Sequence, residues 1–167
     1  MKSIAYFITS LNRFFFQSAK WVIFLIVPVM LFEVLSRYIF GASTIWASEL
    51  ATLLFGPYFL LGGPYLLFLG GHVAVDLIKE KAGAKLSFVM ELIGLGMGFV
   101  FATILAIYSA SQAYNSFLLH ETSFSTWNPQ IWPFKIFLPI ASVLLGLQVI
   151  ANLIFLFSHD KSQEKTI

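Results

Sequence analysis

Two carboxylates and an arginine lie close together in the sequence, beside long apolar segments. Glu33 and Arg37 are four residues apart, a spacing that places both on one face of a helix, and Glu49 follows across a short loop. Charges in such surroundings need a partner or a function. We expect Arg37 to pair with Glu33, with Glu49 or with both, and so to tie two helices together. The alternative is that one carboxylate binds Na⁺ or a proton, although the arginine would compete with that cation.

A histidine and an aspartate, His72 and Asp76, form a second pair at the same spacing. Such a pair can relay protons, but at the end of an apolar segment it is more often a structural hydrogen bond, and we expect that role. Haem ligation by two histidines needs them inside apolar segments, and the three histidines of this chain lie in loops or at segment ends. The chain also has no cysteine. We therefore expect no catalytic residue, no cofactor, no metal site and no enzymatic activity.

The elements that position these residues follow from the composition. The chain has 167 residues, of which 59% are hydrophobic and only 11% are charged. A soluble domain carries about 25% charged residues, so this chain has too few to cover a surface in water. Crossing roughly 30 Å of hydrocarbon takes about 20 mostly apolar residues. The sequence predicts an all-α integral membrane protein, a single domain over residues 1–167, with four transmembrane helices at about residues 21–38, 47–69, 86–108 and 133–157.

The first 19 residues have a different character from the four apolar segments. Phe7, Leu11 and Phe14 recur near helical spacing, with Asn12 and Arg13 among them. This pattern indicates an N-terminal amphipathic helix lying on the membrane surface. The alternative is a simple extension of the first transmembrane helix.

The lysines and arginines of the short connections predict the orientation. Three precede the first apolar segment, one lies near the first loop, three lie in the second loop, none in the third and two in the tail at residues 158–167. Because cytoplasmic loops carry the excess of Lys and Arg, we expect both termini in the cytoplasm and the first and third loops on the other side.

Two of the apolar segments carry signs of helix–helix packing. In the third, small residues recur every four positions, a pattern that lets helix backbones approach closely in lipid. They are Gly94, Gly98, Ala102, Ala106 and Ala110. In the fourth, Gln148 and Asn152 share one face, and we expect them to hydrogen-bond to a neighbouring helix.

Three short motifs resemble a known family. The runs RYIFG at residues 37–41, WASELA at 46–51 and GGHVAVDL at 70–77 are similar to the small membrane subunit (DctQ-type) of tripartite ATP-independent periplasmic (TRAP) transporters. The family pattern is an arginine that ends the first helix, Trp-x-x-Glu that opens the second, and Gly-x-His-x-x-x-Asp after it. Here these positions are Arg37, Trp46, Glu49, His72 and Asp76. The resemblance covers residues from about 20 to 157.

The resemblance implies a non-catalytic subunit in a bacterial inner membrane, part of a Na⁺-dependent symporter that imports an organic acid. Its partners would be a large elevator-type membrane subunit, which holds the substrate and Na⁺, a periplasmic substrate-binding protein, and membrane lipids, with no nucleic acid. The small subunit would form part of the fixed scaffold. The motif positions would hold its fold and its junction with the large subunit.

The third loop, residues 109–132, is rich in Ser, Thr, Asn and aromatic residues. Given the resemblance, we expect it to form part of the docking surface for the binding protein, with Glu121, Trp127 and Asn128 as candidates. A solvated connector anchored by interfacial tryptophans is the alternative.

Two other function classes make different predictions. A membrane anchor of a redox complex would need histidines within the apolar segments. A stand-alone four-helix carrier would need a polar stripe through mid-membrane, where this sequence is nearly all apolar.

Overall fold

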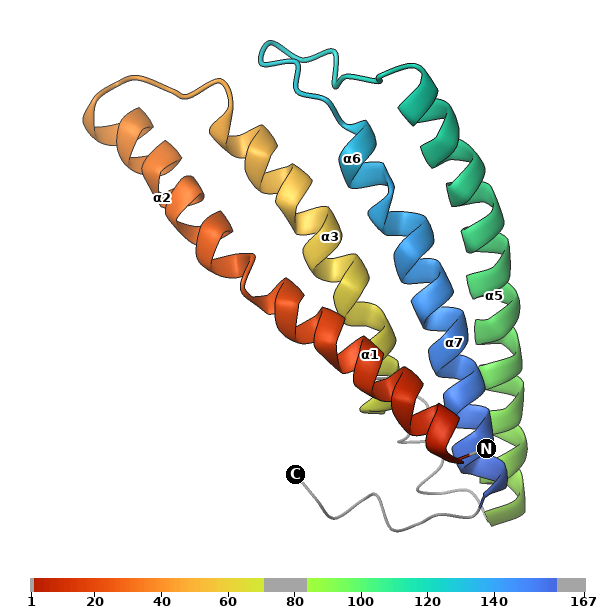
Figure 1. The fold of residues 1–167 in the computed structure, drawn as a ribbon. Helices are drawn as coiled ribbons and strands as arrows, with labels where there is room; N and C mark the ends of the chain where they lie inside the picture. Colours follow the sequence, from red (N-terminus) through yellow and green to blue (C-terminus); the bar gives the residue numbers. More distant parts are fainter. Residues whose placement is uncertain (1, 71–83, 159–167) are drawn as a thin grey trace.

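The computed structural model describes residues 2–70 and 84–158, and this part of the chain is helical apart from its connections. The helices are α1 (Lys2–Lys20), α2 (Ile23–Ile39), α3 (Ala47–Phe68), α5 (Ala84–Leu118), α6 (Trp132–Lys135) and α7 (Phe137–Phe157) (Figure 1). Four helical segments are long and apolar enough to cross a membrane. The predicted all-α fold with four such helices is therefore confirmed.

The long helices lie side by side in the order α2, α3, α7 and α5, while α1 crosses the lower parts of α3 and α7 (Figure 1). The ring centroids of Tyr6 in α1 and Phe155 in α7 are 5.2 Å apart, so the chain begins beside the end of its last helix. The connections at 40–46 and 119–131 lie together at the opposite end. This arrangement agrees with an even number of crossings. Which end faces the cytoplasm stays a prediction from the lysines and arginines.

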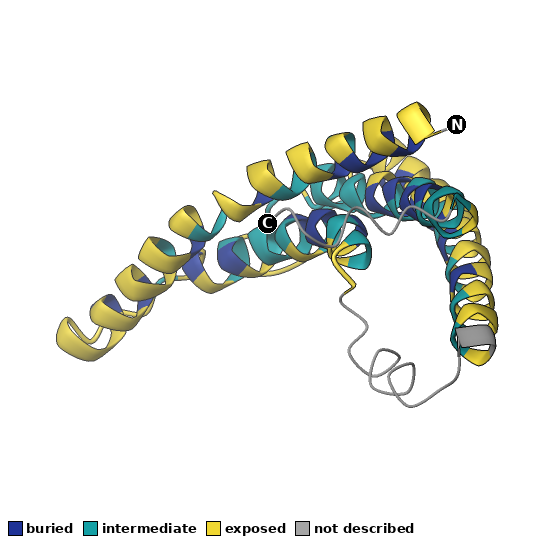
Figure 2. Ribbon diagram, turned by 90° about the horizontal axis from the view of Figure 1, so that it is seen from below, coloured by how far each residue is buried: buried dark blue, intermediate teal, exposed yellow. Residues whose placement is uncertain are grey.

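The two outer helices are packed on one side only. α2 contacts mainly α3, and α5 contacts α7 and α6. Figure 2 shows buried residues where the helices face one another and exposed residues along the outer edges. Large apolar side chains such as Phe24, Leu31, Met97 and Ile107 lie on these outer faces. Because extended apolar patches are unfavourable in water, they need lipid or another membrane protein as cover.

Helix α1 forms over the predicted residues, but its polar face differs from the expectation. An amphipathic helix on a membrane surface turns its polar side chains to water. Asn12 is instead only 1% exposed, whereas Phe7 and Phe14 are exposed. The physical reason is that α7 offers polar partners to Asn12, so the inner face of α1 is polar at this point. Whether α1 also touches the membrane surface stays a prediction.

Part of the predicted small-residue stripe forms the contact between α5 and α7. Ala102 is buried, and a side chain at Gly98 would meet Val149 of α7 at 3.6 Å. Gly94, by contrast, has nothing within 4 Å of the position of a side chain. The reason is the helical period of 3.6: a spacing of four residues drifts around the helix, so a long stripe cannot stay in one contact.

The buried face of α5 follows a spacing of seven residues instead. Its buried members include Leu95, Ala102, Ser109 and Ser116. A seven-residue repeat keeps side chains on one seam between two helices. This face continues past the predicted end of the third span at residue 108, and α5 ends only at Leu118. Residues 109–118 are therefore helix and not loop, and the third connection is shorter than predicted.

Replacing Ala102 with leucine is expected to destabilise the contact between α5 and α7. Ala102 is only 1% exposed and its Cβ faces Gly146 of α7, so the extra atoms of a leucine would have to displace neighbouring atoms in this contact. Overpacking of this kind costs about 1–3 kcal/mol. The matched control is Ala110→Leu on the same helix, because it makes the same exchange at an exposed position. Thermal unfolding in detergent should show a lower Tm for Ala102→Leu alone, and equal changes for the two variants would contradict this packing.

Candidate functional site

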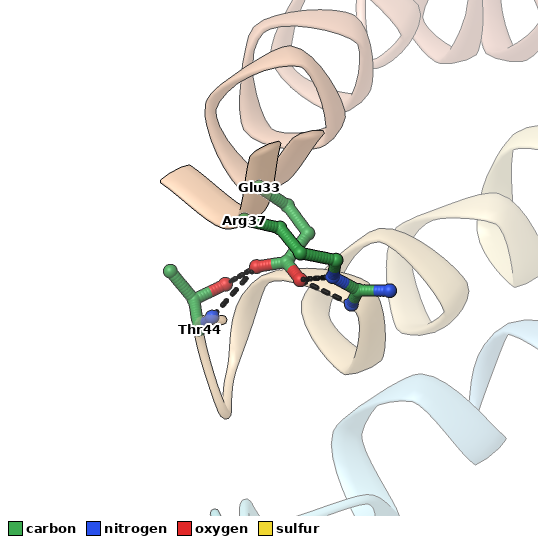
Figure 3. Close-up of polar contacts among 3 residues, drawn as sticks. All are labelled: Glu33, Arg37 and Thr44. Atoms are coloured by element: carbon green, nitrogen blue, oxygen red, sulfur yellow. Dashed lines mark hydrogen bonds and ion pairs between the residues drawn. The ribbon is translucent and has the colours of Figure 1, made fainter. Parts of the chain in front are cut away.

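The connection between α2 and α3 is held by the carboxylate of Glu33 (Figure 3). Arg37 donates from Nε to Glu33 Oε1 at 3.0 Å, and its Nη2 contacts the same oxygen. Thr44 donates its backbone N–H to Glu33 Oε2 at 2.9 Å, and its hydroxyl contacts that oxygen as well. The side chain of Glu33 is 4% exposed and that of Arg37 is 53% exposed. The buried carboxylate is thus neutralised by its own helix and fixed to the loop that follows.

Of the two partners predicted for Arg37, Glu33 is confirmed. Glu49 accepts a hydrogen bond from Ser125 Oγ at 2.6 Å instead. Both oxygens of Glu33 already accept hydrogen bonds, which leaves this carboxylate little capacity for Na⁺. The tie between α2 and α3 comes from Thr44 and from Trp46, whose ring stacks on Phe32 of α2 with centroids 6.0 Å apart.

Glu49 lies in the first turn of α3, where the helix dipole favours a negative charge. Its bond to Ser125 joins the start of α3 to the connection at 119–131, although the two residues are 76 positions apart.

An open hollow of about 470 Å³, rich in hydroxyl groups, lies between the start of α3 with the residues just before it and the connection at 119–131. It is lined by Ser43, Thr44, Ile45, Ser48, Glu49, Thr52, Ser125 and Thr126.

The connection at 119–131 folds back on itself as a short hairpin. Thr122 and Gln130 form an antiparallel bridge, and the Ser123 N–H donates to Pro129 O at 3.0 Å. At the tip, the N–H of Phe124 donates to Asn128 Oδ1 at 3.0 Å. Three non-glycine residues of this connection have positive φ, with Phe124 at 54°. The hairpin therefore has a defined conformation, which its own side chains maintain.

An ion pair fastens the base of the hairpin to α5 and α6. Lys135 Nζ donates to Glu121 Oε2 at 2.6 Å and to Ser116 Oγ at 3.0 Å. The hydrogen bond from Lys135, and after it the contact with Ser116, lowers the pKa of Glu121. Because a lowered pKa keeps the carboxylate ionised, the stability from this ion pair is fully present at neutral pH. It is lost only in acid, as the pH falls through the lowered pKa.

The three residues predicted to dock the binding protein have different roles in the structure. Glu121 and Asn128 hold the hairpin together, while Trp127 is partly exposed. The most exposed large apolar side chain is Phe124, at 87% among the described residues. Sequence reasoning missed it, because a single phenylalanine between serines carries no periodic signal. His72 and Asp76 lie outside the described residues.

A buried polar network joins α1, α3 and α7. Asn12 Nδ2 donates to Gln148 Oε1 at 2.7 Å, and Gln148 Nε2 donates to Thr9 Oγ1 at 3.2 Å and to Asn152 Oδ1 at 3.0 Å. Asn152 Nδ2 reaches Leu67 O of α3 at 3.4 Å. The predicted role of Gln148 and Asn152 is confirmed. Their partner Asn12 was not foreseen, because it is 136 residues from Gln148.

Within residues 2–70 and 84–158, no group of three or more His, Asp or Glu side chains is placed to hold a metal ion. The polar groups of the described chain instead connect elements to one another, as in the Glu33, Glu121 and Gln148 clusters. Among the described residues, the Glu49 hollow brings an open volume together with a carboxylate and several hydroxyl groups, which makes it the candidate binding feature.

Comparison with known proteins relates the chain to a family of transporter components and to a curated bacterial protein. The family model for the DctQ component of tripartite ATP-independent periplasmic transporters matches residues 26–159. A Rhodobacter capsulatus protein, the C4-dicarboxylate TRAP transporter small permease protein DctQ, is 29% identical over 109 residues. These residues are 63% of this chain and 46% of that protein, so the match spans less than half the length of the relative. The family match contains the Glu33 cluster, the Glu49 hollow and the hairpin, and it begins after α1.

Proposed function

This chain belongs to the family of DctQ components of tripartite ATP-independent periplasmic transporters, and on this basis we propose that it is the scaffold subunit of a Na⁺-dependent symporter that imports an organic acid. Proteins of this family are transporter components and not enzymes, as the sequence predicted. Family membership also decides among the three function classes that the sequence left open. In the proposal, the protein lies in a bacterial inner membrane with both termini in the cytoplasm.

The observation that carries the scaffold role is the uncovered apolar surface of the outer helices. α5 contacts α7 and α6 alone among the described helices, and its outer face includes Ile93, Met97, Ile104 and Ile107. α2 likewise leaves Leu31 exposed. In the proposal, the large membrane subunit covers one of these faces and lipid covers the rest. The rigid interior of this chain, fastened by hydrogen bonds among helices, then serves as a fixed wall.

The same reasoning assigns Na⁺ and substrate to the large subunit. A transported anion and its coupled cation need a pocket within the membrane, with several polar groups turned toward it. In the described part of this chain, the polar groups between the helices already bind one another, as Asn12, Gln148 and Asn152 do. Glu33 is neutralised by Arg37. These contacts support a non-catalytic role.

Co-purification tests the proposed function. The tagged chain, expressed with its large membrane subunit, should elute in a fixed ratio with that protein and transport an organic acid only when Na⁺ and the binding protein are present. A homo-oligomer without a large subunit would contradict the proposal, and so would a coloured, haem-containing preparation. The matched comparison is the large subunit expressed alone, which should lose transport.

A further inference from the structure

The carboxylate in the hydroxyl-lined hollow has no cation beside it. In the described residues at this end of the molecule, Arg37 pairs with Glu33 and Lys135 pairs with Glu121. Glu49 receives only the hydroxyl of Ser125. A carboxylate accepts several hydrogen bonds through its two oxygens, so capacity remains at Glu49. The negative charge of Glu49 is thus balanced by the dipole of α3 and one hydroxyl, with no cationic side chain beside it among the described residues.

The remaining wall of the hollow suits a cationic side chain. Ser43, Ser48 and Thr126 line the same hollow as Glu49, and hydroxyl oxygens accept hydrogen bonds. Lysine and arginine carry several N–H donors and no acceptor, which matches a set of acceptors around one negative charge. The hollow is open, so a side chain from another molecule can enter it.

Beside the hollow, the hairpin tip presents an aromatic ring. Phe124 precedes Ser125, is 87% exposed and has a φ of 54°, which is unfavourable for a side chain of this size. Asn128 maintains this conformation by accepting the Phe124 N–H. Strained conformations that the surrounding structure maintains are typical of binding sites. An aromatic side chain has few rotatable bonds and so loses little entropy on binding, which makes it a good anchor.

We propose that the Glu49 hollow receives a lysine or arginine of the soluble substrate-binding protein while Phe124 packs into an apolar recess of the same protein. This inference rests on the proposed function, which supplies that protein as the partner. Charge complementarity selects it over lipid. Anionic lipid head groups would be repelled by Glu49, and the hairpin has no lysine or arginine to attract them.

The first test measures how tightly the binding protein docks. The complex of this chain with its large subunit is placed in nanodiscs, and purified binding protein is titrated at low and high salt. Glu49→Gln should weaken binding about tenfold at low salt and flatten the salt dependence, since an ion pair across an interface is screened by salt. Glu49→Asp keeps the charge and should keep the salt dependence. Unchanged affinity and salt slope in Glu49→Gln would overturn the inference.

Charge exchange identifies the partner residue. Glu49→Lys should abolish docking, and one Lys→Glu or Arg→Glu variant of the binding protein should restore it. If no such variant restores docking, the inference is wrong. It is also wrong if Glu49→Gln changes the Na⁺ dependence of transport while docking stays at the wild-type level, because the hollow would then be a cation site.

A photoreactive amino acid in place of Phe124 identifies the molecule that docks at the hairpin, and this test does not require any change to Glu49. Crosslinks to the binding protein support the inference, whereas crosslinks only to lipid or to the large subunit, or none, overturn it. The same probe at Trp127 tests the residue predicted from the sequence. The two proposals fail in distinguishable ways. If the large subunit is lost from the purified complex, the proposed function is contradicted. If the complex stays intact and Glu49→Gln leaves docking unaltered, only the inference about the Glu49 hollow is contradicted.

Discussion

Replacing Arg37 with leucine is expected to lower the free energy of unfolding by about 2–3 kcal/mol. The loss arises because Glu33, whose side chain is 4% exposed, would keep a buried negative charge without its cation. Breaking a fully buried ion pair costs about 3–5 kcal/mol, and the half-exposed position of Arg37 reduces that value. Thr44 would still bind the carboxylate but carries no charge to neutralise it.

The measurement is unfolding in mixed detergent micelles, followed by the loss of helical circular dichroism. Arg13→Leu is the matched control, because it removes the same side chain from an exposed position on α1. Equal stability of the two variants would show that Arg37 does not neutralise Glu33. The complex with the large subunit should also form in lower yield with Arg37→Leu, since a less stable chain supplies less folded protein for assembly.

Replacing Gln148 with leucine is expected to cost about 1–3 kcal/mol, through the polar groups it leaves unpaired. Its amide connects Asn12, Thr9 and Asn152, and none of these reaches water easily among apolar helices. Asn12→Leu should cost less than Gln148→Leu. Asn12 Oδ1 is buried without a hydrogen-bond partner in the described structure, so its removal offsets part of the loss.

The double variant Asn12→Leu/Gln148→Leu completes a mutant cycle. Asn12 Nδ2 also donates to Leu144 O at 3.3 Å, so Gln148→Leu leaves only one of its two N–H groups unpaired, and Asn12→Leu leaves Gln148 Oε1 unpaired. Because each single variant already breaks the shared hydrogen bond, the two losses should sum to more than the loss in the double variant, by at least about 0.5 kcal/mol. Gln17→Leu, at an exposed position on α1, is the control for adding an apolar side chain. Additive losses would mean that Asn12 and Gln148 contribute independently, and the network would then not hold α1 to α7.

Local spacing made the helices and the Glu33–Arg37 pair predictable. Long apolar runs specify membrane helices almost by length alone, and two residues four apart on a helix meet whatever the rest of the fold does. The contact of Glu49 with Ser125 was not predictable in this way, because it depends on how two distant connections meet. The same holds for Asn12, whose polar character indicated a solvated face until its partner on α7 was known.

The length of α5 was underestimated for a related reason. The criterion of about 20 apolar residues estimates how much of the chain crosses the hydrocarbon layer. It does not give the full length of the helix, which can continue into water where its residues are polar. Residues 109–118 continue the helix because Ser109 and Ser116 remain on its buried seam. The seven-residue spacing from Leu95 to Ser116 runs past residue 108, but its last two members are serines, so hydrophobic periodicity does not reveal it.

The length of α5 also sets a distance between the hairpin at 119–131 and the bilayer. If residues 86–108 fill the hydrocarbon, the last ten residues of α5 extend up to about 15 Å beyond it along the helix axis. The Lys135–Glu121 ion pair holds the base of the hairpin at that height. A soluble protein can then reach Phe124 without displacing lipid head groups. The helix therefore acts as a spacer whose shortening by one turn would lower the hairpin about 5 Å toward the head groups.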